Sequence, residues 1–559
     1  MVKGIFRLIE REISGLHEAA YLLGVFALLS QILGFFRDRL LASNFGAGQI
    51  LDMYYAAFRV PDLIFIWSAS MVSLSVLIPF LSNRRDESKE AARVFLSSVF
   101  SAFFLFIVVV SVVAFWCAPT LIGMLFPGFS GEAVTETVFL TRIMLLQPIF
   151  LGISNLFASV TQLERRFFVY AISPILYNVG LIVGVFALYP LMGLAGLAWG
   201  VVLGSLLHLG IQIPVMMNTG MMPRFCIPDW GLIKKVLMVS LPRTLALSLQ
   251  NITILLLTAL GSLLGIGSIA IFNLSWNLQS VPLAIVGASY SLAAFPTLAG
   301  LWTKGEKGVF ISTLSTAMRH VLFWSMPALV LFVVLRAQIV RTVLGSGAFD
   351  WNDTRLTAAA LALFAVSVVA QSISLLFTRG YYAAGKTRTP LLVAVGGALL
   401  TICSAFLFSK LFVQTPIVRY FFESILRVSD LPGTKMLVLP LSYSIGAIGS
   451  ALIFWILYTK HFQRFQVAVY HMFWQSFASS VIMGFVSYSL LNVLSTVYNL
   501  HTTLGVFLQG FLAGIGGLAF GVCVLYLLGN VEIREIWKTL HRKIWKAKFI
   551  GPDPTETTF

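Results

Sequence analysis

Long apolar stretches follow one another from about residue 20 to about residue 529, and short segments rich in charged residues, Gly or Pro separate them. A membrane-crossing helix needs about 20 mostly apolar residues to span roughly 30 Å of hydrocarbon. The pattern therefore predicts an all-α polytopic membrane protein with 14 transmembrane helices. We expect these helices over residues 20–42, 52–80, 92–118, 133–159, 165–189, 192–218, 236–262, 267–300, 318–342, 355–385, 389–412, 437–459, 471–496 and 504–529.

The composition excludes a soluble enzyme. Of the 559 residues, 58% are hydrophobic and only 11% are charged, whereas a soluble domain is close to half apolar and a quarter charged. No polar stretch between the apolar ones is long enough for a separate soluble domain. Residues 1–19 alternate apolar and basic positions at helical spacing, which indicates an amphipathic segment lying on the membrane surface.

The net charge of +16 is explained by the membrane topology. With 14 helices, 26 of the 38 Lys and Arg fall in loops on one side, nine on the other, and three inside helices. Cytoplasmic loops of membrane proteins carry this excess of Lys and Arg. We therefore expect both termini in the cytoplasm and no nucleic-acid partner, even for the basic tail.

Weak internal symmetry predicts how the helices are grouped. The second and eighth helices carry similar Pro patterns, at Pro61 and Pro79 and at Pro282 and Pro296. Parallel repeats of this kind place a substrate cavity between two lobes. We expect an interfacial segment at 1–19, an N-lobe of six helices at 20–235, a C-lobe of six helices at 236–460, two extra helices within 461–529, and a basic cytoplasmic tail at 530–559.

Motifs for enzyme chemistry, metals or nucleotides are weak. The segment from Gly380 to Thr387 matches the P-loop letters, but it follows a membrane helix, whereas a nucleotide-binding loop follows a β-strand. The histidines are scattered, and no clustered carboxylate pair is present. The four cysteines have no metal-ligand spacing and are interpreted as small core residues. We expect no enzyme activity, no metal and no ATP or other cofactor.

Charges at membrane depth are the most informative residues, because such charges cost several kcal/mol and persist mainly where they face a cavity or a partner. Arg59 and Arg243 lie inside the second and seventh predicted helices, and Arg142 lies inside the fourth. Asp52 and Arg59, seven residues apart, share one helical face. Amides at Gln31, Gln250, Asn251, Asn273 and Asn277 fall in the first, seventh and eighth helices. We hypothesise a hydrated, net-positive cavity bounded by these helices.

The opening of the chain resembles a known family. The stretch Leu33-Gly34-Phe35-Phe36-Arg37-Asp38, followed by Phe45-Gly46-Ala47-Gly48, Asp52, Ala57-Phe58 and Pro61, is similar to the signature of the MurJ (MviN) lipid II flippases. These belong to the multidrug, oligosaccharidyl-lipid and polysaccharide exporter superfamily. Weaker similarities, such as Pro127-Gly128-Phe129 and Thr389-Pro390, follow in family order over nearly the whole chain.

The resemblance implies two lobes in a V around a basic central cavity, in the bacterial cytoplasmic (inner) membrane. It also implies export of lipid II, an undecaprenyl-pyrophosphate-linked peptidoglycan precursor, to the outer leaflet by alternating access. Cationic residues would bind the pyrophosphate, and Arg37 and Asp52 match family positions. The partners that the resemblance implies are the lipid-linked substrate, the lipid bilayer and, less directly, the cell-wall synthesis machinery.

Several family charges are missing. Gln31 stands where the family has an arginine, Phe65 and Ile66 replace an arginine pair, and Asn277 aligns with an arginine of the eighth helix. Either Arg59, Arg243 and Arg142 compensate for the missing charges, or the cargo differs from lipid II. We predict a substrate-binding set of Arg37, Arg59, Arg243, Gln31 and Asn277.

Transport needs no ATP in this interpretation. Moving about two negative charges outward is favoured by roughly 4–5 kcal/mol at 100 mV, negative inside. For ion coupling, Asp52 is the first candidate and Asp62 the second, because no Asp or Glu occurs from Gly231 through Gly305.

Two other functions stay open at this point. A cation-coupled multidrug exporter of the same superfamily would favour acidic cavity residues, whereas the charges here lean basic. A non-transporting scaffold derived from a flippase would explain the missing arginines.

Overall fold

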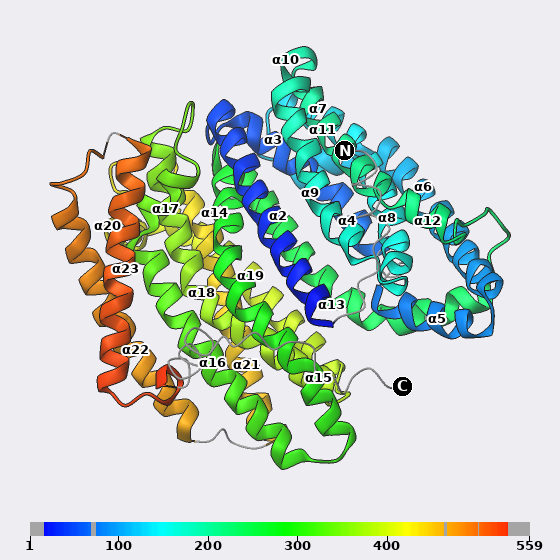
Figure 1. Cartoon of the computed structure of the whole chain (residues 1–559). Coiled ribbons are helices and arrows are strands. Elements are labelled where there is room, and N and C mark those ends of the chain that lie inside the picture. The colour runs from blue at the N-terminus through cyan, green and yellow to red at the C-terminus, as the bar shows by residue number, and fades with distance from the viewer. Residues whose placement is uncertain (1–15, 69–73, 463–466, 501, 535–559) are drawn as a thin grey trace, which may run out of the picture. The chain divides into compact units, whose positions relative to one another are not determined.

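The computed structural model describes residues 16–68, 74–462, 467–500 and 502–534, and every regular element within these ranges is helical (Figure 1). The all-α fold expected from the sequence is confirmed. The N-terminal interfacial segment and the basic tail lie almost wholly outside the described residues, so both stay predictions. The helices, in chain order, are α2 (Leu16–Phe45), α3 (Gln49–Ala57), α4 (Arg59–Ser68), α5 (Leu74–Glu87), α6 (Lys89–Leu125), α7 (Gly131–Met144), α8 (Leu146–Leu163), α9 (Phe167–Val183), η1 (Gly184–Leu188), α10 (Tyr189–Met192), α11 (Leu194–Gly210), α12 (Ile213–Asn218), α13 (Trp230–Ser262), α14 (Ser268–Pro282), η2 (Leu283–Ala288), α15 (Ser289–Thr303), α16 (Lys307–Val334), α17 (Arg336–Val343), α18 (Trp351–Ala383), α19 (Arg388–Gln414), α20 (Pro416–Leu426), η3 (Thr434–Leu437), α21 (Val438–His461), α22 (Val467–Leu494) and α23 (Thr503–Leu527).

Eleven helical stretches in the described part of the chain are long and apolar enough to cross a membrane. The protein is therefore a multi-pass membrane protein, although the expected number of 14 spans is not confirmed. The three other predicted spans coincide with α2, with α3 to α5, and with α13. Each of these three segments includes positions outside what the structure fully describes, so their membrane crossings stay predictions.

Polar residues define several helix starts. Ser88 and Ser130 accept hydrogen bonds from the backbone N–H groups of Ala91 and Ala133, at the starts of α6 and α7. Asp229 accepts from two N–H groups at the start of α13. Such N-caps satisfy donors that have no partner within the helix.

Several predicted spans are broken in the structure. The predicted helix 52–80 is divided at Phe58, between α3 and α4, and the predicted helix 133–159 is divided at Leu145, between α7 and α8. Pro148 follows the second break closely, and its missing N–H weakens the helix there. Wider π-helical turns, η1 and η2, interrupt two further spans.

The chain divides into two compact units. The first unit holds residues 1–279, 340–367 and 386–453, and the second unit holds the remainder. In the first unit, α2 packs on α9, α9 on α11, and α13 on α19. In the second unit, α16 packs on α22 and α22 on α23. The lobe boundaries inferred from the sequence, and the central cavity between the lobes, stay predictions.

The surface of the bundle is strongly apolar. Large side chains such as Trp116 and Phe485 are more than two-thirds exposed, as expected where the solvent is lipid. The four cysteines, Cys117, Cys226, Cys403 and Cys523, are free and exposed. Their interpretation as core residues was wrong. Cys117, Cys403 and Cys523 lie in membrane helices, where an apolar position can face lipid as easily as the protein interior, and Cys226 lies in the segment between α12 and α13.

Close contact between α9 and α11 depends on glycines. A Cβ atom added to Gly200 would lie 2.5 Å from the Cα atom of Gly184, and one added to Gly180 would lie 2.2 Å from the Cα atom of Gly204. Small residues at four-residue spacing allow membrane helices to approach this closely.

We predict that Gly200→Ala lowers the stability of the purified protein, by about 1–3 kcal/mol, because the added methyl group forces the two helices apart. Gly123 of α6 is the control, since a Cβ atom there meets nothing within 4 Å and alanine favours a helix. Thermal unfolding in detergent measures both variants. Equal melting temperatures for Gly200→Ala and Gly123→Ala would contradict the packing described.

Candidate functional site

The charged residues of α2 form a hydrogen-bonded network inside the first unit. The Nε and Nη2 atoms of Arg37 donate to Oδ1 of Asp38 at 2.9 and 2.7 Å. The Nη1 atom donates to Oδ1 of Asn178, on α9, at 3.0 Å. Arg37 is therefore held between a carboxylate of its own helix and an amide of a neighbouring helix.

Asp38 connects this network to α14. Its carboxylate is buried, and Oδ2 accepts a hydrogen bond from Nδ2 of Asn277 at 2.9 Å. Two residues predicted from the sequence, Arg37 and Asn277, are thus brought together by a third that was not selected. Asp38 follows Arg37 directly in the family-like signature, and a carboxylate beside a buried arginine was the signal that could have identified it.

Asp52 caps the start of α14. The carboxylate is buried, and its Oδ2 and Oδ1 atoms accept hydrogen bonds from the backbone N–H groups of Gly267 at 2.6 Å and Ala270 at 2.7 Å. A carboxylate at this position is also favoured by the helix dipole. Asp52 was predicted as an ion-coupling residue, but the contacts observed are those of a helix cap.

Arg59 also faces α14, one turn further along. Its Nη2 atom donates to Oδ1 of Asn273 at 2.5 Å. Its Nε atom is buried and has no hydrogen-bond partner among the described residues, and the same is true of the Tyr55 hydroxyl, four residues earlier. Asp52 and Arg59 thus both contact α14, although the break at Phe58 places them on separate helices. Arg59 and Tyr55 both offer a free donor.

Asp62 lies on the next turn of α4. It interacts electrostatically with Arg59 and lies near Gln147 of α8. Gln147 donates to the hydroxyl of Tyr177 at 3.3 Å. We use the name polar cluster for these residues together: Arg37, Asp38, Asp52, Tyr55, Arg59, Asp62, Gln147, Asn178, Asn273 and Asn277.

The described side chains of the polar cluster include two guanidinium groups and three carboxylates. Arg243 was predicted as a further cation of this cavity, and its side chain lies outside what the structure describes. Gln31 is half-buried on α2 and makes no side-chain hydrogen bond with the described residues. The predicted set is therefore only partly brought together, with Arg37, Asn277, Arg59, Asp52 and Asp62 in one region.

Residues between the end of α2 and the start of α3 form a second set of contacts, which we call the α2–α3 joint. Arg39 donates to the carbonyl oxygens of Thr342 and Val343, at 2.6 and 3.3 Å, where α17 ends. The carbonyl oxygen of Ser43 accepts from the N–H of Ala348 at 2.8 Å. The N–H of Ala47 donates to the Asp353 carboxylate, in the first turn of α18, at 2.9 Å. With the Asp52 cap, the joint fixes three separate segments to α2 and α3.

The P-loop letters at 380–387 have no nucleotide-binding geometry. Gly380 lies inside α18, and the described residues before it are helical rather than a strand. Gly385 has a φ of +70° and turns the chain toward α19. The motif is a helix–helix turn.

Comparisons with known proteins agree with the sequence motifs. A model for the family described as lipid II flippase MurJ matches residues 41–509. The lipid II flippase MurJ of Burkholderia cenocepacia is 26% identical over 396 residues, which cover 69% of this chain and 77% of the relative. A probable lipid II flippase MurJ of Buchnera aphidicola subsp. Acyrthosiphon pisum is 27% identical over 380 residues, covering 67% and 74%.

Solved structures show the same fold. A structure of lipid II flippase MurJ in an inward closed conformation has a TM-score of 0.71 at 22% identity, covering 91% of this chain and 99% of that one. An inward-facing multidrug resistance MATE family transporter of the MOP superfamily has a TM-score of 0.59 at 15% identity, covering 78% and 97%.

We predict that Asp52→Ala destabilises the protein by roughly 3 kcal/mol, because two charge-assisted hydrogen bonds to the start of α14 are lost. Asp52→Asn keeps one acceptor oxygen and is expected to lose about half as much. Asp86, an exposed residue at the end of α5, provides the control substitution Asp86→Asn. Chemical or thermal unfolding in detergent ranks the stabilities of the three variants. An Asp52→Ala variant as stable as the wild-type protein would exclude the capping role.

Proposed function

Because this chain belongs to the lipid II flippase MurJ family, we propose that it moves lipid II from the inner to the outer leaflet of a bacterial cytoplasmic membrane. One structural observation supports this proposal in addition to family membership. Arg59 and Tyr55 each have a buried hydrogen-bond donor with no partner among the described residues, inside an apolar bundle. A buried donor without a partner costs free energy. An anionic substrate would satisfy both donors when bound.

The polar cluster suits a pyrophosphate. Guanidinium groups bind phosphate oxygens with strong, charge-assisted hydrogen bonds, and Arg59 has one nitrogen committed to Asn273 and another free. Arg37 is committed to Asp38 and Asn178, so substrate contact there requires this network to open. We assign Arg59 the first contact with the pyrophosphate and Arg37 a later one.

The excess of Lys and Arg in alternate loops supports an orientation with both termini in the cytoplasm. In that orientation the α2–α3 joint and the start of α14 lie toward the outer face. The contacts of Arg39, Ser43, Ala47 and Asp52 then close the outer ends of these helices. Release to the outer leaflet requires these contacts to break, which makes the joint the gate of an alternating-access cycle.

The membrane potential supplies enough free energy for export. About two negative charges moving outward gain roughly 4–5 kcal/mol at 100 mV, so neither ATP nor another cofactor is required. Asp52 is occupied as a helix cap, and we therefore propose Asp62 as the carboxylate that couples an ion to the return of the empty transporter. The product would be supplied to the cell-wall synthesis enzymes on the outer face.

Two alternatives are separated from this proposal by experiment. The similarity to MATE transporters concerns the fold, and a multidrug exporter would confer drug resistance without relieving a block in lipid II export. A non-transporting scaffold would do neither.

We predict that this chain restores growth to a bacterial strain depleted of its own lipid II flippase, and that lipid II no longer accumulates in the inner leaflet. Arg59→Gln is expected to reduce transport by about tenfold or more, which corresponds to at least 1.4 kcal/mol. Arg84→Gln is the control, because Arg84 pairs with Glu87 on an exposed helix end. Failure of the wild-type chain, or equal transport by both variants, would contradict the proposal.

We also predict that a cross-link across the α2–α3 joint stops transport. A Cβ atom at Gly347 would lie 2.3 Å from the carbonyl oxygen and 2.5 Å from Oγ of Ser43, so cysteines at the two positions are within reach of a disulfide after a local shift of the backbone. Oxidation of the Ser43→Cys, Gly347→Cys double variant should abolish lipid II export, and reduction should restore it. Each single variant controls for strain at Gly347, where φ is +58°. Undiminished export by the oxidised double variant would show that the joint is not a gate.

A further inference from the structure

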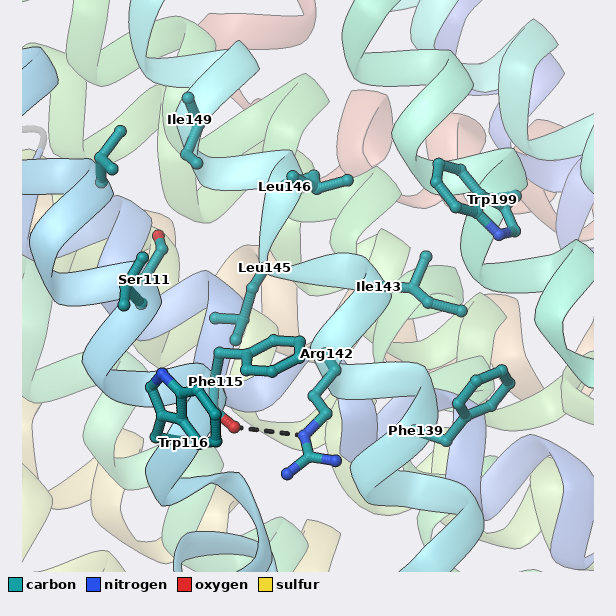
Figure 2. A pocket seen from close by; sticks show the side chains of 12 residues that line it. Ser111, Phe115, Trp116, Phe139, Arg142, Ile143, Leu145, Leu146, Ile149 and Trp199 are labelled. Atoms are coloured by element: carbon teal, nitrogen blue, oxygen red, sulfur yellow. Dashed lines mark hydrogen bonds between the residues drawn. The ribbon is translucent and has the colours of Figure 1, made fainter.

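An apolar groove lies on the first unit, away from the polar cluster. It has a volume of about 590 Å³, which is in the range of ligand-binding pockets. Figure 2 shows that the side chains lining it come from α6, α7, α8 and α11. Ten of the twelve lining residues are hydrophobic; the two polar ones are Ser111 and Arg142.

Arg142 brings a charge into this apolar groove. Its Nε atom donates to the carbonyl oxygen of Phe115 at 3.2 Å, and its guanidinium lies over the Phe115 ring, 4.8 Å from the centroid (Figure 2). No carboxylate lies within 4 Å of it in the described part of the chain. The positive charge is thus oriented by a carbonyl and a ring and is left without a counter-ion.

The helix break between α7 and α8 shapes the groove. Leu145 stands at the break, Leu146 begins α8, and both line the groove together with Ile149. Gln147, the residue after Leu146, is buried and belongs to the polar cluster. Opposite faces of the bent α7–α8 segment therefore contribute to the groove and to the polar cluster.

Exposed tryptophans mark the level of this groove in the membrane, and Arg142 lies beside Phe115 and Trp116 in it. Trp116 is 74% exposed and Trp199 39% exposed on the same groove. Tryptophan is enriched at the level of lipid headgroups, so the groove extends from the headgroup level into the acyl-chain region.

We propose that this groove is a binding site for an anionic phospholipid, with one acyl chain in the groove and the phosphodiester on Arg142. The single guanidinium matches the single negative charge of a phosphodiester, whereas a pyrophosphate needs more than one cation. Charge complementarity favours an anionic over a zwitterionic lipid, because the quaternary ammonium of the latter would lie beside Arg142. The site shares no residue with the polar cluster, so a phospholipid can stay bound while cargo is transported.

The test uses the full chain, purified and delipidated in a neutral detergent. Phosphatidylglycerol is expected to raise its melting temperature by about 4 °C or more at saturation, and phosphatidylcholine with the same acyl chains much less. Arg142→Gln should weaken phosphatidylglycerol binding at least tenfold, and Arg142→Lys should restore part of it. Arg341→Gln is the matched control, because Arg341 also lies over an aromatic ring, that of Trp351, but does not line the groove.

A second variant separates the groove from general attraction between charges. Val112→Trp fills the groove while leaving Arg142 in place, and it should lose phosphatidylglycerol binding with no loss of folding. Glycerol phosphate, which has no acyl chain, should not stabilise the wild-type protein. Equal binding of both phospholipids, unchanged binding by Arg142→Gln and Val112→Trp, or displacement of phosphatidylglycerol by an equimolar polyprenyl pyrophosphate would each overturn the proposal. Lipid II export by Val112→Trp, measured in parallel, tests the proposed function separately.

Discussion

A charge inside a membrane protein has to be compensated by the protein itself, and the contact between Asp52 and the start of α14 does this most completely. Both carboxylate oxygens accept backbone N–H bonds, at 2.6 and 2.7 Å. The same contact satisfies donors that a buried helix start would otherwise leave unpaired. It also fixes the register between α3 and α14, which places Arg59 opposite Asn273 one turn further on. The position of the polar cluster depends on this one contact.

The missing family arginines are explained in part by this network. Asn277, where the resemblance leads one to expect an arginine, donates to Asp38, and Asp38 also holds Arg37. The Asn277 amide on α14 thus makes a contact to the Asp38 carboxylate that an arginine at this position could also make. Asparagine leaves the polar cluster with one positive charge fewer than arginine would. The free donors of Arg59 and Tyr55 become correspondingly more important for an anionic cargo.

Apolar periodicity and loop charge were sufficient to predict the all-α membrane fold, because burial in lipid imposes a length and a composition on each helix. They did not predict the breaks at Phe58 and Leu145, which depend on tertiary contacts as well as on nearby residues. Asp52 and Arg59 both contact α14, but they do so from two helices and not from one face of a continuous helix as predicted. The capping role of Asp52 was missed because its partners are backbone groups 215 and 218 positions away, and backbone donors leave no mark in the sequence. The groove at Arg142 was missed for a similar reason, because residues of four helices form it. From the sequence, Arg142 was considered only as a further cation for the cargo.

We propose that the polar cluster receives the pyrophosphate of a lipid-linked precursor at Arg59. A cryo-electron microscopy structure of the purified protein with lipid II tests this most directly. We expect diphosphate density within hydrogen-bonding distance of the Arg59 guanidinium and the Tyr55 hydroxyl, and loss of that density in Arg59→Gln. Diphosphate density elsewhere, with Arg59 and Tyr55 unchanged and without ligand, would contradict it.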